Sequence, residues 1–239
     1  MLNILGSAWT MRMLAVADVH SPRFLDPFLR SLEQFSPPDL FLMAGDMINR
    51  GRATEFRVIL DAIHDSLGND FQIVACYGNE EYSEVRNDIS AAIGRDMVFL
   101  DETMTVVEVD GQKVGIVGTQ GSLDKPTNWQ RQHLPSVRRT FELRAHRAGS
   151  LLKKLRNKVD RRILLMHYSP CLETCQGEDS RTFGWLGSRK FYNLIMSEQP
   201  DLVIHGHVHN SVNHEAHIGE TLVRNVAMPA VGTLTQLSF

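Results

Sequence analysis

The first half of the chain alternates between short apolar runs and stretches with helical spacing of apolar residues. Uninterrupted apolar runs bounded by turn residues predict buried strands, at residues 12–17, 39–44 and 72–77. Apolar residues at spacings of three and four predict helices between them, at residues 25–35, 56–67 and 85–93. Gly68 and Gly94 follow the last two helices as C-caps. Strand and helix alternating at this rhythm favour a sheet with parallel strands.

The middle of the chain has a different pattern. Asp110-Gly111 separates two β-type runs, residues 103–109 and 113–119, which is a strong signal for a hairpin. Residues 120–135 are polar and are predicted to form a loop. A long amphipathic helix is predicted to follow. Its apolar stripe consists of Val137, Phe141, Ala145, Ala148, Leu152, Leu155 and Val159.

The last part returns to strands. Buried-type runs at 162–166 and 201–204 flank a helix predicted from about residue 186 to 198. Three more strands are expected, at residues 211–217, 220–226 and 231–237. The pattern predicts a single α/β domain over residues 11–239, with a loop and basic helix excursion at about 120–160. Residues 1–10 are expected to be a disordered extension, with Met11 or Met13 as an alternative start.

Composition limits the class of protein. The 239 residues carry a net charge of −3, which argues against a chain built as a whole to coat nucleic acid. No apolar run reaches the roughly 20 residues that a membrane-spanning helix needs. The three cysteines cannot all pair within the chain, which suits a reducing cytoplasm, and we expect a cytoplasmic protein.

Polar side chains suited to metal binding follow five of the predicted strands. In an extended chain, residues i and i+2 point the same way, so Asp18 can bind with His20 and His207 with His209. In open α/β sheets ligands bind outside the carboxyl ends of the strands, where these residues should gather. Glycines at three of the strand ends, Gly45, Gly78 and Gly206, would allow close backbone approach. The candidate metal ligands are Asp18, His20, Asp46, Asn79, His167, His207 and His209.

The order of these residues resembles the calcineurin-like metallophosphoesterases. The resemblance runs from residue 18 to 209 through Asp18-x-His20, Gly45-Asp46 with Arg50-Gly51, Gly78-Asn79, His167 and Gly206-His207-x-His209. It implies a fold of two packed mixed β-sheets flanked by α-helices, in four layers. It also implies that one metal ion binds Asp18, His20 and His209, that a second binds Asn79, His167 and His207, and that Asp46 bridges them.

The chemistry of the donors fits this division. Two divalent ions would carry about +4 and the two aspartates about −2, so with a bridging hydroxide the centre keeps about +1 and attracts phosphate. Carboxylate, amide and imidazole donors without thiolate suit manganese, iron or zinc. We expect two divalent or trivalent ions, Mn²⁺ or a mixed iron–manganese pair above the others. The expected activity is hydrolysis of a phosphoester through a dinuclear centre.

One position departs from the family pattern. Many members have Gly-Asn-His, whereas this chain has Gly78-Asn79-Glu80. Glu80 is expected either to replace that histidine as an acid with a raised pKa or to have no chemical role. It could equally open the following helix, since acids favour a first turn. A charged Glu80 would disfavour dianionic monoesters, which favours a phosphodiesterase. The candidate catalytic residues are Asp46, Asn79, Glu80, His207 and Arg50, the last as a phosphate contact or a plain surface arginine.

Other interpretations stay open. A nuclease or nucleotide pyrophosphatase could use the same centre, and residues 136–162 carry ten Lys or Arg against two acids. Nucleic acid could bind there, although a solvated amphipathic helix is the favoured interpretation. A non-catalytic scaffold of the same fold is the alternative from another class. The segment 173–185, with Phe183 and Trp185, is expected either to line a substrate pocket or to pack internally.

Overall fold

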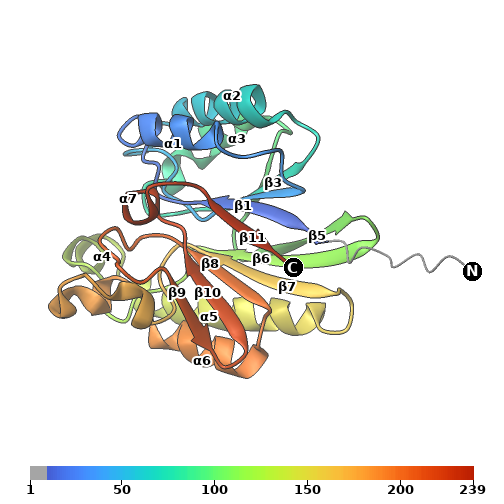
Figure 1. The fold of residues 1–239 in the computed structure, drawn as a ribbon. Coiled ribbons are helices and arrows are strands. Elements are labelled where there is room, and N and C mark those ends of the chain that lie inside the picture. The colour runs from blue at the N-terminus through green and yellow to red at the C-terminus, as the bar shows by residue number, and fades with distance from the viewer. Residues whose placement is uncertain (1–9) are drawn as a thin grey trace, which may run out of the picture.

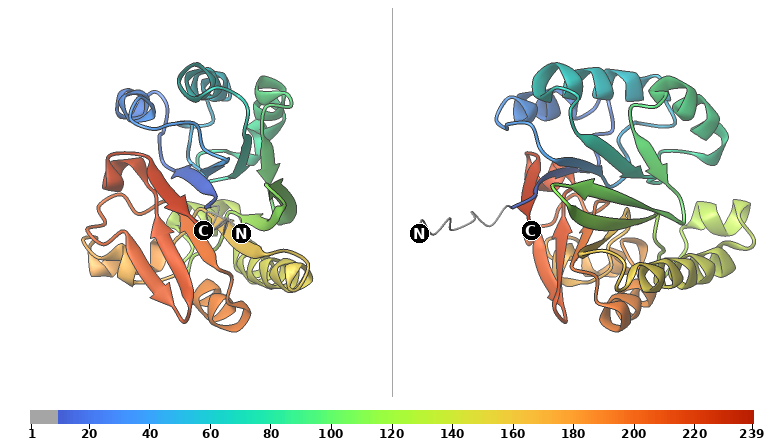
Figure 2. Two further views of the ribbon diagram at one scale, coloured as in Figure 1. Left: turned by 45° about the vertical axis from the view of Figure 1, so that its right-hand side comes forward. Right: turned by 90° about the vertical axis from the view of Figure 1, so that its right-hand side faces the viewer.

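The computed structural model describes residues 10–239, so the expectation of a disordered extension at residues 1–10 lies almost wholly outside the described residues. Two β-sheets pack face to face, and helices cover the outer side of each sheet (Figure 1). Figure 2 shows the same four layers from two further directions, with α1 to α3 on one side and α5 and α6 on the other. The fold that the resemblance implied is therefore confirmed.

The first sheet holds five strands in the order β11-β1-β2-β3-β4. Neighbours from β1 to β4 are parallel, whereas β11 is antiparallel to β1, so the sheet is mixed. Its strands are β1 (Arg12–Val16), β2 (Leu40–Met43), β3 (Gln72–Cys76), β4 (Val98–Leu100) and β11 (Thr235–Ser238). The helices on its outer side are α1 (Leu25–Leu32), α2 (Glu55–Leu67) and α3 (Arg86–Ile93).

The second sheet holds six strands in the order β5-β6-β7-β8-β10-β9, with antiparallel strands at both edges. Its strands are β5 (Thr103–Val109), β6 (Gln112–Thr119), β7 (Arg161–Met166), β8 (Leu202–His205), β9 (Glu215–Ile218) and β10 (Thr221–Asn225). The helices α5 (Val137–Leu155) and α6 (Arg189–Glu198) pack against each other and against this sheet.

The core explains why the central strands read as uninterrupted apolar runs. Along β1, Leu14 and Val16 face the helices, whereas Met13 and Ala15 face the other sheet. Both faces of these strands are covered, so neither face needs polar side chains. The carboxyl ends of the parallel strands are left free to carry polar groups.

The structure differs from the sequence-based elements at a few places. Residues 120–135 are not wholly a loop, because α4 (Asn128–His133) begins there with a capping box between Thr127 and Gln130. The strand β4 was not predicted. The run 231–237 forms a strand only over β11, since α7 (Met228–Val231) precedes it and ends at Gly232.

Within residues 10–239 no helix combines the length and apolarity that a membrane crossing requires. All three cysteines are buried and unpaired.

Candidate metal centre

All seven candidate ligands lie just beyond the carboxyl ends of parallel strands. Those that follow β1, β2 and β3 come from the first sheet, and those that follow β7 and β8 come from the second. The structure brings six of them together in two groups of three, and in each group the donor atoms lie within 4.8 Å of one another. The groups are Asp18, His20 and His209, and Asp46, His167 and His207.

The first group centres on one oxygen of Asp18. Asp18 Oδ1 lies 2.9 Å from His209 Nε2 and 3.6 Å from His20 Nε2. His20 Nε2 is buried and has no hydrogen-bond partner among the residues that the structure describes. A buried imidazole nitrogen without a partner beside a buried carboxylate fits a metal ligand, because a cation would satisfy both.

The second group contains the asparagine as well. His167 Nε2 lies 3.3 Å from Asp46 Oδ2 and 3.1 Å from Asn79 Oδ1. The other ring nitrogen, Nδ1, donates to the carbonyl of Ala44 at 2.9 Å. That bond fixes the tautomer of a neutral ring and leaves Nε2 free to bind a metal ion.

Asp46 stands between the two groups. Its Oδ2 is 3.3 Å from His167 Nε2 and 3.8 Å from His20 Nε2. Its Oδ1 accepts the backbone N–H of Glu80 at 2.7 Å, which fixes the carboxylate plane. Its carboxylate thus lies within 3.8 Å of an imidazole nitrogen from each of the two groups.

His207 is held from both ends. Its backbone N–H donates to Asp18 Oδ2 at 2.7 Å, and its Nε2 donates to the carbonyl of Trp185 at 3.2 Å. The ring therefore has Nδ1 left as the donor atom for a metal ion. His207 and His209 belong to different groups, so they do not reach into one site as their i, i+2 spacing predicted.

The ligands come from turns and not from extended chain. The φ angles of Asp18 (59°), His20 (42°), Asp46 (52°) and His207 (68°) are all positive. Left-handed backbone is uncommon outside glycine and is often found at functional sites. The prediction that extended backbone aims these side chains was wrong, although Asp18 and His20 do share a group.

The glycines allow the close approach that the sequence predicted. A Cβ on Gly78 would lie 2.2 Å from Asp46 Oδ1, and one on Gly206 would lie 2.3 Å from Asp18 Oδ2. Gly45 has φ 84°, and a Cβ there would lie 2.5 Å from the backbone nitrogen of Gly78. A side chain at any of these positions would displace a ligand.

Without metal ions, the buried carboxylates and imidazoles shift one another's pKa values. Burial raises the pKa of Asp18, but the neighbouring imidazoles of His20 and His209 outweigh this effect and leave that pKa far below its usual range. Burial lowers the pKa of His167, yet the charge of Asp46 and the hydrogen bond to it raise it to about 9. Burial and the charge of His167 lower the pKa of His207 to about 4.

Glu80 and Arg50 lie beside the two groups. The Glu80 carboxylate accepts the backbone N–H of Arg50 at 2.6 Å and the hydroxyl of Tyr82 at 3.4 Å. These bonds tie the loop after β3 to the loop after β2, which is a structural role. The Arg50 side chain is exposed, and the backbone of this residue has a positive φ angle of 51°.

Glu81 supports the loops that carry two of the candidate ligands, and the sequence pattern did not predict this role. It is 1% exposed, and its two oxygens accept the backbone N–H groups of Gly78 (2.7 Å), Asp46 (2.8 Å), Met47 (2.8 Å) and Ile48 (3.3 Å). Burial and the charge of Asp46 raise its pKa to about 7, against the lowering effect of the backbone donors. An acid directly after Gly-Asn-Glu was the available signal.

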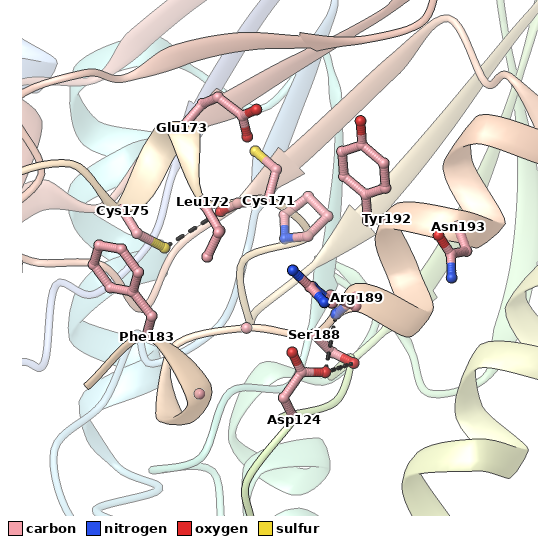
Figure 3. A pocket seen from close by; sticks show the side chains of 13 residues that line it. Asp124, Cys171, Leu172, Glu173, Cys175, Phe183, Ser188, Arg189, Tyr192 and Asn193 are labelled. Carbon is pink, nitrogen blue, oxygen red and sulfur yellow. Dashed lines mark hydrogen bonds between the residues drawn. The ribbon is translucent and has the colours of Figure 1, made fainter. Parts of the chain in front are cut away.

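Figure 3 shows a cavity of about 510 Å³, part of whose lining belongs to the same segment as Trp185, the partner of His207. Its lining is mostly apolar and includes Leu172, Phe183 and Tyr192, and none of the seven ligands lines it. The segment 183–188 contacts both the metal-ligand cluster and the cavity. The carbonyl of Trp185 accepts from His207, and Phe183 and Ser188 line the cavity. Phe183 is thus a pocket residue, whereas Trp185 lies outside the lining, 39% exposed.

Two packed mixed sheets with a ligand cluster at their shared edge define a metallophosphoesterase fold. The profile described as calcineurin-like phosphoesterase matches residues 11–211, and the chain belongs to this family. No curated protein matches the chain in a sequence comparison.

Solved structures share the fold at low sequence identity. A phosphopantetheinyl hydrolase of Mycobacterium tuberculosis has 14% identity and a TM-score of 0.67, over 94% of this chain and 95% of that one. A putative 5′-nucleotidase of Staphylococcus aureus has 15% identity and a TM-score of 0.62, over 96% and 51%. GAP50, the anchor in the inner membrane complex of Plasmodium, has 12% identity and a TM-score of 0.58, over 93% and 72%.

We expect Glu81→Gln to destabilise the protein and weaken metal binding. A glutamine has one carbonyl oxygen in place of two carboxylate oxygens, so at least one buried N–H would lose its acceptor, at about 1–3 kcal/mol. Urea unfolding and metal titration measure the two effects. Glu80→Gln is the matched control, because the Glu80 carboxylate accepts from one backbone N–H at the surface. Equal effects of the two substitutions would contradict the assignment.

In the metal-free protein we expect stability to fall as pH rises from about 7 to about 9. The pKa of His167 is 6.5 in the unfolded chain and about 9 in the folded one, so the folded state binds more protons in this range. The pKa of His20 is also raised and acts in the same direction. Urea unfolding with a chelator measures the slope. The dependence of the free energy of unfolding on pH should be weaker in His167→Asn and in the presence of saturating metal. An unchanged dependence in His167→Asn would show that it does not come from His167.

Proposed function

We propose that the protein hydrolyses a phosphodiester at a dinuclear metal centre held by the seven ligands. The observation that supports this most is the position of Asp46, whose Oδ2 is within 3.8 Å of an imidazole nitrogen from each group. A carboxylate shared in this way is what two neighbouring ions require. Mn²⁺ is the proposed ion, with iron and zinc as alternatives, because the donors include no thiolate.

The side chains of the protein would act by holding the metal ions and by orienting the substrate. When bound, the two ions supply an acidified water and polarise the phosphoryl oxygens. Asp18 and Asp46 have lowered pKa values and stay ionised. Asn79 turns Oδ1 toward the second group, which leaves its amide N–H groups to donate to a phosphoryl oxygen. We assign Arg50, on the exposed loop after Asp46, to a second phosphate contact.

The preference for a diester rests on Glu80. Its backbone N–H donates to Asp46 Oδ1, and its carboxylate is held by the backbone N–H of Arg50. A fixed negative charge there repels a dianionic monoester more strongly than a monoanionic diester. The histidine of the family pattern would have the opposite effect when protonated.

We also propose that the cavity lined by Leu172, Phe183 and Tyr192 receives the organic group of the ester. Most of its lining is apolar, which suits an aromatic or aliphatic group. The segment 183–188 would then link recognition of that group to His207, through the carbonyl of Trp185.

A hydrolysis panel tests the reaction. After chelation, we expect bis(p-nitrophenyl) phosphate to be hydrolysed faster than p-nitrophenyl phosphate, and Mn²⁺ to support more activity than Zn²⁺ or Mg²⁺. Asp46→Asn should lower kcat by about 100-fold or more, since loss of a mere supporting residue already costs roughly 10- to 100-fold. Glu80→His and Glu80→Ala should both lower the preference for the diester.

The panel also separates the alternatives. An unchanged diester preference in both Glu80 variants would contradict the role of that charge. Activity on DNA or RNA that falls steeply with salt would favour a nuclease that binds through residues 136–162. Inactivity on all substrates with metal bound would favour a scaffold, a use for which GAP50, the anchor in the inner membrane complex of Plasmodium, offers a parallel.

Phe183→Ala tests the cavity. Loss of an aromatic contact of about 1 kcal/mol should raise KM roughly 5-fold for diesters with an aryl group. The KM of a methyl ester should change little, because a methyl group does not fill the cavity. Val58→Ala, at an exposed position on α2, is the control. Equal changes in KM for aryl and methyl esters would refute binding of the organic group in this cavity.

A further inference from the structure

Two buried side chains at the ends of neighbouring strands contact the loop that carries His207 and His209. They are His205, the last residue of β8, and Asn225, the last residue of β10, and both are 0% exposed. The strands pair in parallel with these two residues in register. Neither residue belongs to the ligand groups, and neither is used by the proposed reaction.

His205 holds the peptide unit that precedes His207. Its Nδ1 lies 2.9 Å from the carbonyl oxygen of Gly206. A carbonyl can only accept, so Nδ1 carries the proton, and Nε2 accepts from the hydroxyl of Thr174 at 2.9 Å. The N–H of the same peptide unit donates to Asp18 Oδ2 at 2.7 Å. Both polar groups of the Gly206–His207 peptide are therefore held.

Asn225 holds the peptide unit that precedes His209. Its Nδ2 donates to the carbonyl of Val208 at 2.9 Å. Its Oδ1 accepts the N–H of Ala227 at 3.1 Å, and its own N–H donates to the carbonyl of His214 at 2.9 Å. The amide is thus fixed on both sides, and the donor it presents to Val208 has one orientation.

We propose that His205 and Asn225 are positioning residues, each for a different metal ion. The proposal rests on the dinuclear centre proposed above. His207 belongs to the group of Asp46 and His167, and His209 to the group of Asp18 and His20. Rotation of a peptide unit moves the side chain that follows it, and metal–ligand distances tolerate only about 0.2 Å. His205 thus acts on the second ion and Asn225 on the first.

As a consequence, the affinity for each of the two ions can be lowered separately, without substitution of a metal ligand. His205→Phe removes the donor to Gly206 and keeps a ring of similar size. Asn225→Leu removes the donor to Val208 and keeps the volume. Supporting hydrogen bonds of this kind change metal affinity by roughly 10- to 100-fold. Thr174→Val should weaken the same ion as His205→Phe, because it removes the donor that fixes the tautomer of His205.

Titration of Mn²⁺ into the metal-free protein, followed by calorimetry and by electron paramagnetic resonance, tests the proposal. The wild type should bind a coupled pair of ions. In a His209→Ala background only the second group is complete, and there His205→Phe should lower affinity while Asn225→Leu should not. In a His167→Ala background the effects should be reversed. His205→Asn, which places an amide N–H near the position of Nδ1, should restore part of the affinity.

The outcomes separate this proposal from the one it rests on. Failure of the wild type to bind a pair would overturn the dinuclear centre itself. The division between His205 and Asn225 would be overturned if the wild type binds a pair of ions and each substitution lowers the affinity for both ions equally. It would also be overturned if neither substitution changes the affinity. Melting curves in chelator show whether a variant folds. Thr174→Val repeats the test with a smaller change if His205→Phe does not fold, and unchanged affinity in Thr174→Val would overturn the role of His205.

Discussion

The centre depends on the burial of two carboxylates without an arginine or lysine beside them. Asp18 is 0% exposed and Asp46 is 1% exposed, and in the described part of the chain their ion-pair partners are histidines. Buried anions are unfavourable unless a cation or hydrogen-bond donors compensate them. The histidines provide part of that compensation by holding protons, as the raised pKa of His167 shows. Metal ions would provide the rest, which is why the same groups that are costly in an empty site are suited to a filled one.

The loops around these carboxylates are held mainly by bonds between side chains and backbone. Glu81 gathers four N–H groups from the loops after β2 and β3, and Asp18 accepts the N–H of His207 from the other sheet. Such bonds hold residues with positive φ in conformations that are rare for side chains other than glycine. The candidate ligands are therefore positioned by a hydrogen-bond network that joins loops from both sheets. The geometry of the centre depends on all of these loops together.

Much of this arrangement could be predicted from the sequence, for identifiable reasons. Apolar runs marked the central strands because both of their faces are buried, and the order of Asp18, Asp46, Asn79 and His167 placed ligands at their ends. Geometry within the turns could not be predicted, because it depends on φ angles and not on spacing. The division of His207 and His209 was available from the resemblance and not from periodicity. The acid after Gly-Asn-Glu marks Glu81 in the sequence, but the pattern does not show that this carboxylate is buried and accepts four backbone N–H groups, because the donors come from two separate loops.

The strand β1, which leads to Asp18, lies between β2 and β11, and Arg12 pairs with Ser238. Pairing of segments so distant in the chain is slow, because much of the entropy of loop closure is lost before the contacts form. We therefore expect the first sheet to be completed late in folding. An ion that needs donors from both sheets cannot serve as a nucleus for this process. It would instead bind a chain that has already folded, so the supply of metal in the cell should set how long the protein stays folded and not how fast it folds.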